Sequence, residues 1–327
     1  MTAPALRSST LVFKPFVLKY CDTYMLKFAY SLRETRMQTL RKPEWIKTRL
    51  PGFGAYPHIR HVLRKYMLHT VCEEAMCPNL GECWGGGTAT IMILGDICTR
   101  GCRFCAVKTG HPQGFVDASE PEKVAKAVEE INLKYVVLTS VCRDDLADGG
   151  ASIYAETVKK IKERKGEVLV EVLIPDFDAV PEHLERVVRA GPDVVAHNVE
   201  TVRRLTPYVR DRRASFDKSL KVLRLVKEFN PSMYTKSSIM VGLGETVEEV
   251  LDALKELRQA DVDFVTIGQY LRPTLNHLPV KEYVHPDVFK LYEREALRMG
   301  FKYAACGPLV RSSYRAAEFF VESMLKR

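Results

Sequence analysis

The middle of the chain alternates between two patterns of hydrophobic positions. Short apolar runs, typical of buried strands, are separated by segments in which apolar residues recur every three or four positions, as on one face of a helix. The runs predict strands at 88–94, 135–140, 167–174, 193–197, 234–241 and 264–268. Strands that alternate with helices indicate an α/β protein with a parallel sheet. Because a full eight-unit barrel takes about 250 residues, we expect a partial, six-stranded (β/α)6 barrel of the TIM type.

Helix signals support the segments between these strands. Ser119 can cap a helix that has Pro121 in its first turn. Thr246 and Glu249 have the spacing of a capping box. The remaining helices are predicted at 58–68, 151–165, 184–188, 215–229 and 288–295.

The chain divides into four predicted parts. They are a leader or disordered extension over 1–36, an N-terminal extension over 37–86, the barrel over 87–285 and a C-terminal segment over 286–327. The leader is basic, with Arg7, Lys14, Lys19, Lys27, Arg33 and Arg36 against Asp22 and Glu34. This composition fits a transit peptide, and equally an upstream extension before Met37. We expect a cytoplasmic protein, or one of an organellar matrix if the leader is a transit peptide.

Composition excludes two classes of partner. No run of about 18 apolar residues exists, so no membrane span is expected. The net charge of +8 (49 basic and 41 acidic residues) could steer an acidic partner. The basic residues are scattered and not interleaved with aromatic residues, so we expect no binding of nucleic acid.

The nine cysteines are unevenly distributed. Six fall into two groups of three, whereas Cys21, Cys142 and Cys306 stand alone. An odd, clustered set argues against a disulfide framework and for a metal protein in a reducing compartment.

One group follows the strand at 88–94 directly. Cys98, Cys102 and Cys105 have the spacing C-x3-C-x2-C, and three thiolates on one loop can hold three irons of a 4Fe–4S cluster. The fourth iron would then be open to a small chelating molecule, such as the amino and carboxylate groups of a methionine. The alternatives are a zinc knuckle without its fourth ligand, or three unrelated buried thiols.

The second group lies upstream of the predicted barrel. Cys72, Cys77 and Cys83 have the wider spacing C-x4-C-x5-C, on a path that Pro78 and Gly81 force into a loop. This set again indicates an iron–sulfur cluster that lacks one cysteine ligand. Structural zinc with a distant fourth ligand is the alternative.

Polar stretches follow several of the predicted strands. They cover 143–145, 197–200, 242–245 and 269–273. In barrels of this type the chemistry lies on loops at the carboxyl ends of the strands, so we expect these stretches at one barrel mouth. The stretch 311–314 (Arg-Ser-Ser-Tyr), taken alone, fits a turn that caps a final helix.

Two levels of resemblance follow from these motifs. The loop 98–105, with Phe104 just before its last cysteine, resembles the signature of the radical S-adenosylmethionine (SAM) enzymes. Over about residues 40–320 the chain resembles the lipoyl synthase family, on both cysteine groups together with 311–314. Further matching stretches are 141–150, 197–201, 240–245 and 268–273, whereas the first 36 residues lie outside the pattern.

The resemblance implies two 4Fe–4S clusters and SAM as cofactors. Cys98, Cys102 and Cys105 would hold the cluster that cleaves SAM, with Phe104 beside the adenine. An auxiliary cluster, the sulfur donor, would be held by Cys72, Cys77, Cys83 and Ser313. The substrate would be an octanoyl-lysine, which receives sulfur at carbons 6 and 8 to become lipoyl-lysine. These carbons carry unactivated C–H bonds that no acid or base can break, so the hard step falls to the cofactor.

The resemblance also implies contacts with SAM. Asn198 and Glu200 would meet the nucleoside, and Arg212 would pair with the carboxylate through its planar fork. For the run 210–213, a solvated surface turn is the alternative. Asp144 and Asp145 would either bind the SAM amino group or cap the next helix.

The implied partners are an octanoylated lipoyl carrier domain or glycine-cleavage carrier protein, a reducing electron donor and an iron–sulfur cluster carrier. We expect a monomer, because a substrate presented by a carrier needs an accessible mouth. One alternative is another radical SAM sulfur-inserting enzyme, similar to biotin synthase or the methylthiotransferases. A non-enzymatic iron–sulfur electron carrier is the other, although carriers normally close their sites with a fourth cysteine.

Overall fold

An eight-stranded sheet forms the centre of the computed structural model, which describes residues 40–47 and 54–313. Its strands follow one another in sequence order, and residues Arg41–Arg327 group as one unit. The strands are β1 (His69–Thr70), β2 (Thr90–Ile93), β3 (Tyr135–Ser140), β4 (Leu169–Leu173), β5 (Val194–Ala196), β6 (Tyr234–Val241), β7 (Phe264–Gln269) and β8 (Tyr303–Gly307). Strand β1 runs antiparallel to β2, and all later neighbours are parallel.

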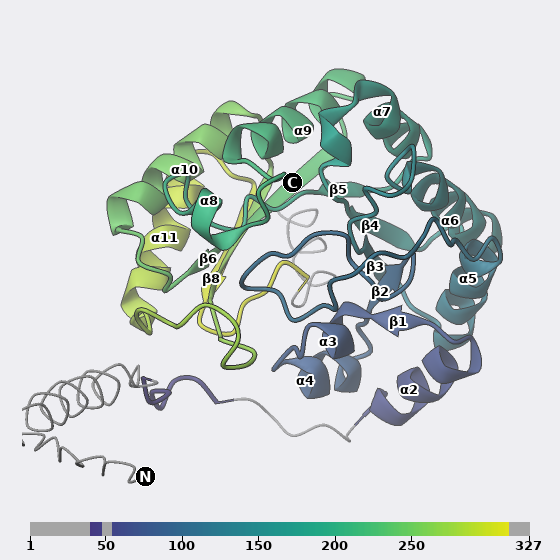
Figure 1. The fold of residues 1–327 in the computed structure, drawn as a ribbon, viewed down its shortest axis with the longest axis horizontal. Coiled ribbons are helices and arrows are strands. Elements are labelled where there is room, and N and C mark those ends of the chain that lie inside the picture. The colour runs from purple at the N-terminus through teal and green to yellow at the C-terminus, as the bar shows by residue number, and fades with distance from the viewer. Residues whose placement is uncertain (1–39, 48–53, 314–327) are drawn as a thin grey trace, which may run out of the picture. The chain divides into compact units, whose positions relative to one another are not determined.

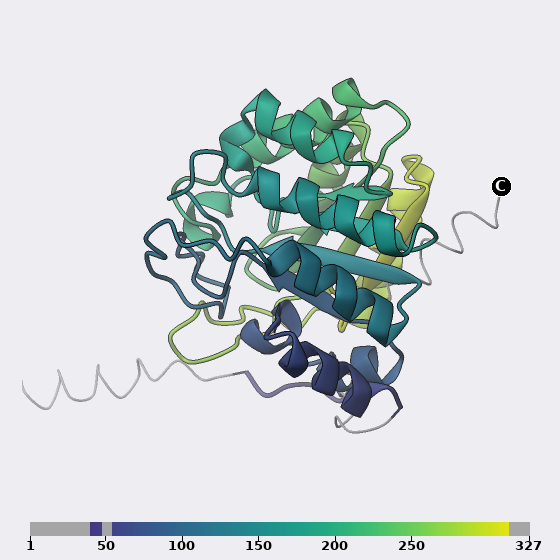
Figure 2. The ribbon, with the colours of Figure 1, turned by 90° about the vertical axis from the view of Figure 1, so that its right-hand side faces the viewer.

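Helices cover the outer side of this curved sheet, and the long loops gather at one end of it (Figures 1 and 2). The helical segments are α2 (Tyr56–Lys65), α3 (Val71–Glu74), α4 (Leu80–Gly85), α5 (Glu120–Ile131), α6 (Ala151–Arg164), the 3-10 turn η1 (Phe177–Ala179), α7 (Pro181–Arg189), α8 (Thr206–Val209), α9 (Phe216–Phe229), α10 (Val247–Gln259) and α11 (Pro286–Arg298). None of the helices in the described ranges is long and apolar enough to span a membrane.

The six predicted strands are confirmed as β2 to β7, each within a few residues of its predicted bounds. Two further strands were not predicted. Strand β1 has two residues, too few to show a period, and β8 reads Tyr-Ala-Ala-Cys-Gly without a β-branched residue. The pairing of β8 with β7 extends the partial barrel by one parallel strand.

Local signals set the helix starts. The capping box of α10 is present, since the Thr246 hydroxyl accepts from the Glu249 N–H at 3.3 Å and the Glu249 carboxylate accepts from the Thr246 N–H at 2.8 Å. Ser119 does occupy the residue before α5, but its side chain does not cap the helix. The Ser119 hydroxyl donates instead to Asp117 at 2.5 Å, so the predicted cap is wrong in its chemistry.

A buried ion pair lies near the amino ends of the strands. Glu171 on β4 accepts from the Lys236 ammonium at 2.9 Å and from the Tyr135 hydroxyl at 2.6 Å. The Glu171 and Lys236 side chains are 1% and 6% exposed. Each charge has its partner, which is the condition for burying an ion pair.

Strands β1 and β8 form the two edges of the sheet, which are not paired with each other. The segment after β8 reaches back toward β2. Asn79 donates to the Leu309 carbonyl at 2.5 Å, and the Thr90 hydroxyl donates to the Ser313 hydroxyl at 2.9 Å. The last described residues of the chain therefore cross the open side of the barrel and contact its first parallel strand.

Candidate active site

One cavity of about 480 Å³ lies at the carboxyl ends of the strands. It is lined by both groups of cysteines and by the hydroxyl residue that the sequence pairs with the second group, namely Cys72, Cys77, Cys83, Cys98, Cys102, Cys105 and Ser313. Residues that are up to 241 positions apart in the sequence thus share one interior space. The arrangement can hold two groups facing each other with a substrate between them.

The loop from Cys98 to Cys105 is held by backbone hydrogen bonds. The Cys98 N–H donates to the Lys108 carbonyl at 2.8 Å, and the Gly110 N–H donates to the Cys98 carbonyl at 2.9 Å. Two further N–H groups point at sulfur, from Arg100 to Cys98 Sγ at 3.4 Å and from Asp211 to Cys102 Sγ at 3.3 Å. Donors aimed at sulfur favour the thiolate form that iron requires.

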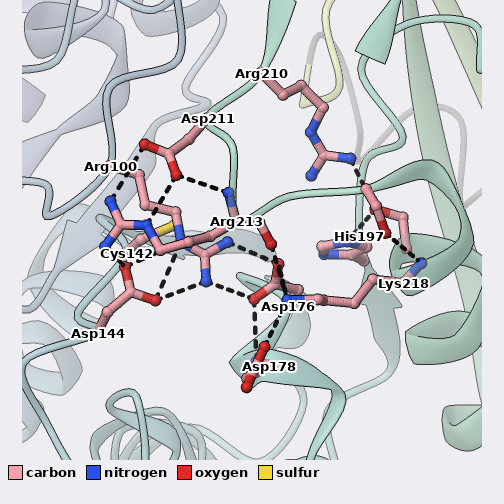
Figure 3. A network of polar contacts seen from close by, with 12 residues as sticks. Arg100, Cys142, Asp144, Asp176, Asp178, His197, Arg210, Asp211, Arg213 and Lys218 are labelled. Atoms are coloured by element: carbon pink, nitrogen blue, oxygen red, sulfur yellow. Dashed lines mark hydrogen bonds and ion pairs between the residues drawn. The ribbon is translucent and has the colours of Figure 1, made fainter. Parts of the chain in front are cut away.

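Arg100, within this loop, anchors it to two neighbouring strand ends (Figure 3). Its guanidinium donates to Asp144, which follows β3, at 2.6 Å and to Asp176, which follows β4, at 2.7 Å. Burial acts to raise the pKa of Asp176, but the hydrogen bonds and charge of Arg100 outweigh it and lower the pKa to about 2. The loop is therefore fixed by a buried cation between two carboxylates.

The prediction that Asp144 or Asp145 caps the next helix is wrong, because helix α6 begins at Ala151, after Gly150, without a side-chain cap. Neither residue lines the cavity. Asp144 pairs with Arg100 and Arg213, and Asp145 pairs with Arg143 at 2.8 Å. Hydrogen bonding to Arg143 lowers the pKa of Asp145 to about 2. Both acids hold loops in place.

The second cysteine group lies on two short helices beside the barrel. Cys72 is on α3, Cys83 is on α4, and Cys77 is on the turn between them. Burial raises the pKa of the Cys72 thiol to about 11, against an opposing hydrogen bond from the Thr90 backbone N–H. Metal binding must therefore displace the Cys72 proton.

Each group of three cysteines offers thiolates, the usual ligands of a 4Fe–4S cluster. In the described part of the chain, no three His, Cys, Asp or Glu side chains converge closely enough to hold one metal ion. A zinc ion would need such convergence, whereas the ligands of a 4Fe–4S cluster bind different irons and stand further apart. The shared cavity provides the space between them.

Asn198 and Glu200, which follow β5, both line the cavity. Asn198 donates to the Glu200 carboxylate at 3.1 Å, while its buried Oδ1 has no hydrogen-bond partner among the described residues. Glu200 has a φ of +67°, which a residue other than glycine adopts only at a cost. Burial raises the pKa of Glu200. An unpaired amide oxygen and a strained, half-buried acid are typical of a binding site.

Phe104 also lines the cavity, but Arg212 does not. Arg212 is exposed, and of its basic run it is Arg210 that faces the cavity. The alternative for this run, a solvated turn, thus fits Arg212 and Arg213, which are both exposed.

Four cavity residues were not among the predicted site residues. Cys142 forms a hydrogen bond with Cys98 that lowers the pKa of the Cys98 thiol. Thr90 contacts the second cysteine group, and Arg311 lines the cavity from the segment after β8. The fourth is Asp176, which follows β4. The expectation that polar residues after a strand lie at the barrel mouth could have identified it. No pattern in the sequence marked Thr90 or Cys142.

Known families match most of the chain. Residues 92–269 match the model of the radical SAM superfamily, and residues 20–77 match that of the N-terminal domain of lipoyl synthase. The second match begins inside the segment 1–36, so the prediction that this whole segment lies outside the resemblance is wrong. The chain is 56% identical to a lipoyl synthase of Sorangium cellulosum, over 88% of this chain and 81% of that protein. It is 54% identical to a mitochondrial lipoyl synthase of Uncinocarpus reesii, over 95% and 76%.

Solved structures support the fold. The FeFe-hydrogenase maturase HydG from Carboxydothermus hydrogenoformans superimposes with a TM-score of 0.53 at 17% identity, over 81% of this chain and 68% of that one. At this identity the likeness concerns the fold alone.

Proposed function

The chain belongs to the lipoyl synthase family of radical SAM enzymes, and we propose that it inserts two sulfur atoms at carbons 6 and 8 of a protein-bound octanoyl-lysine. The observation that carries this proposal is the single cavity lined by two cysteine triads and Ser313. An electron carrier would need neither two open triads nor a chamber between them.

Each triad has its own role in the proposal. Cys98, Cys102 and Cys105 hold the cluster that binds SAM, and Cys72, Cys77 and Cys83 hold the auxiliary cluster, with Ser313 as its fourth ligand. When bound, these cofactors supply the radical that removes unactivated hydrogens and the sulfur that replaces them. A serine oxygen is a hard ligand on an iron that normally binds sulfur, which suits a site that must release its ligand when sulfur is withdrawn.

In this proposal, side chains of the cavity bind SAM and orient it. Phe104 offers an apolar face for the adenine, and Asn198 and Glu200 offer an amide oxygen and a carboxylate to the hydroxyls of the ribose. Both groups are hydrogen-bond acceptors, and the Asn198 Oδ1 has no partner among the described residues.

We propose the octanoylated lipoyl domain or glycine-cleavage carrier protein as substrate, and a separate electron donor and cluster carrier as partners. The seven cysteines that line the cavity are free thiols, which fits a reducing compartment, either the cytoplasm or an organellar matrix. A monomer leaves the mouth open to the carrier, and light scattering that detects an obligate dimer would contradict this.

The experiment is anaerobic reconstitution followed by incubation with SAM, a strong reductant and an octanoyl-lysine peptide, read by mass spectrometry. The expected product has two sulfurs in place of two hydrogens, with release of 5′-deoxyadenosine. Deoxyadenosine without sulfur incorporation would mean that the enzyme acts on a different substrate. The absence of both products, with protein shown to hold iron, would reject the proposal.

Two cysteine variants test whether the second cysteine group is needed for sulfur insertion. Cys77→Ala should lose sulfur insertion and keep reductive cleavage of SAM. Cys306→Ala is the control, because Cys306 lies on β8 and does not line the cavity. It should retain both activities.

A further inference from the structure

Three loop segments form a rim around the mouth of the cavity. They are 97–116 after β2, 203–213 at α8 and 271–281 after β7. Each of them contributes residues to the cavity wall, and they belong to the loops that Figure 2 shows at one end of the sheet. The outward side chains of this rim have no role in the chemistry proposed above, so they are free to meet a partner.

Backbone contacts join the three segments into one surface. The Arg103 N–H donates to the Val209 carbonyl at 2.9 Å, and the Leu278 N–H donates to the Arg103 carbonyl at 3.1 Å. His277 Nε2 lies 3.0 Å from the Cys105 carbonyl. The rim is therefore continuous from α8 across the first cysteine loop to the segment after β7.

The rim carries the positive charge of the chain. Its 42 residues include ten lysines and arginines and one acid, Asp211, whereas the rest of the chain has 39 basic and 40 acidic residues. Basic residues that are scattered along the sequence are thus gathered by the fold at the mouth. Clustered charge of one sign attracts an oppositely charged partner and accelerates its association.

Half of these cations are accessible and lack a counter-charge. Arg100, Arg203, Arg204 and Arg213 pair with acids. Leaving aside the buried Arg210, the remaining cations are exposed or half-buried and make no ion pair with any residue in the described part of the chain: Arg103, Lys108, Arg212, Arg272 and Lys281. An acidic protein surface would supply the missing charges.

Two large apolar side chains stand among these cations. Tyr208 is 64% exposed and Leu275 is 76% exposed. Arg103 Nη1 donates to the Tyr208 carbonyl at 3.3 Å, and Arg272 donates to the Leu275 carbonyl, so each apolar residue has an arginine beside it. Tyrosine and arginine are enriched where proteins bind one another. This composition favours a protein partner over a nucleic acid.

We propose that the rim docks the folded carrier domain, with Tyr208 and Leu275 in apolar contact and Lys108 and Arg103 facing acidic residues beside the carrier's octanoyl-lysine. The inference rests on the proposed function, because it takes the carrier as substrate. An octanoyl amide has no charge, so the cavity can select the acyl arm by its shape alone. Discrimination between carriers then requires a surface outside the cavity, which the rim provides.

The test compares binding of an octanoylated glycine-cleavage carrier protein and of an octanoyl-lysine peptide to the anaerobically reconstituted full chain. For the carrier, Tyr208→Ser should weaken binding by about fivefold or more and Leu275→Ser by about threefold or more. Lys108→Glu should slow association of the carrier by about threefold or more. Binding of the peptide should change by less than about twofold, because none of the three residues lines the cavity.

Charge complementarity has its own test. Added salt should weaken binding of the carrier and leave binding of the peptide unchanged. A carrier whose acids beside the octanoyl-lysine are replaced by lysine should bind the unaltered chain less tightly than the natural carrier does, and Lys108→Glu more tightly. Arg224→Glu on α9 and Leu297→Ser on α11 are exposed controls outside the rim, and both should behave as the unaltered chain. Iron content and unfolding temperature identify any variant that fails to fold.

The outcomes separate this inference from the function beneath it. If the unaltered chain converts neither the peptide nor the carrier, the proposed function fails. If it converts both, and the rim variants bind the carrier normally or lose carrier and peptide alike, only the docking surface is wrong. A dimer that Leu275→Ser dissociates, or an RNA probe whose binding alone depends on Lys108, would assign the rim to another partner and overturn the proposal.

Discussion

Thr90 and Ser313 are 223 positions apart in the sequence, and the Thr90 hydroxyl donates to the Ser313 hydroxyl at 2.9 Å. The backbone N–H of the same threonine faces the Cys72 thiol. One residue of strand β2 therefore contacts two of the four proposed ligands of the auxiliary cluster. Because β2 leads directly into the loop of Cys98, it also connects the two proposed cluster sites.

Removal of the Thr90 hydroxyl should loosen the proposed serine ligand. In Thr90→Val the fold should lose about 1 kcal/mol, the typical value of one hydrogen bond. Iron at the second cysteine group should then be lost to a chelator several times faster, as followed by iron content and Mössbauer spectra. Thr90→Ser keeps the donor and should behave as the unaltered protein. Equal rates for the valine and serine variants would show that this hydrogen bond does not support the site.

Substitution of Gly268, on β7, also tests the proposed role of Ser313 as a ligand. A Cβ at this position would lie 2.0 Å from the Val310 carbonyl oxygen, so alanine must displace the segment that carries Ser313. Overpacking of this kind costs about 1–3 kcal/mol, and Gly268→Ala should also lower iron retention at the second cysteine group. Denaturant unfolding and iron analysis measure both effects. In Gly166→Ala the new Cβ would lie 3.5 Å from its nearest neighbour, so this variant should show neither effect.

The barrel could be predicted because its strands are buried on both faces and read as apolar runs. All four residues of β2 are buried, and such runs differ clearly from the helical periodicity around them. Strand β8 lacks that signal, since its alanines and glycine have low β-propensity and only its pairing with β7 identifies it.

At the site, the cysteine spacing predicted two groups of ligands. No feature of the sequence predicted the direction in which an individual side chain points. Arg210 and Arg212 are two positions apart in one basic run, and only the end of helix α8 turns Arg210 inward. The partner of Asp144 is Arg100, 44 positions earlier, so no local pattern could show that this acid is already paired. The sequence therefore predicted roles least well for residues whose partners lie far away in the chain.

The buried ion pairs of Arg100 should contribute more to the free energy of unfolding than a surface ion pair does. Asp176→Asn removes one charge from a contact in which the two side chains are 5% and 1% exposed. Breaking a buried pair typically costs about 3–5 kcal/mol, and because Asp144 remains, we expect about 3 kcal/mol. The Cys98 loop should also bind less iron than the second cysteine group, which spectroscopy on the reconstituted variant can resolve. The exposed pair Arg189 and Glu185 on α7 is the control, and Arg189→Ala should change stability by less than about 1 kcal/mol.

His197 should make stability depend on pH in a defined window. Burial lowers its pKa to about 4 in the folded chain, with Arg210 and Arg100 acting in the same direction and Asp176 opposing them. In the unfolded chain its pKa is about 6.5. Above pH 6.5 the residue is neutral in both states and contributes no dependence. Between pH 6.5 and 4 the unfolded chain binds a proton that the folded chain does not, so the free energy of unfolding should fall by up to about 3 kcal/mol.

A variant isolates this contribution. His197→Gln cannot titrate, so its free energy of unfolding should fall less steeply between pH 6.5 and 4, as measured by urea unfolding at a series of pH values. Asp176 does not interfere, because its pKa is lowered to about 2 and its stabilisation is lost only as the pH falls below the ordinary aspartate value of 3.8. Parallel pH curves for the two proteins would contradict this expectation, because the folded chain would then bind the His197 proton over the same pH range as the unfolded chain.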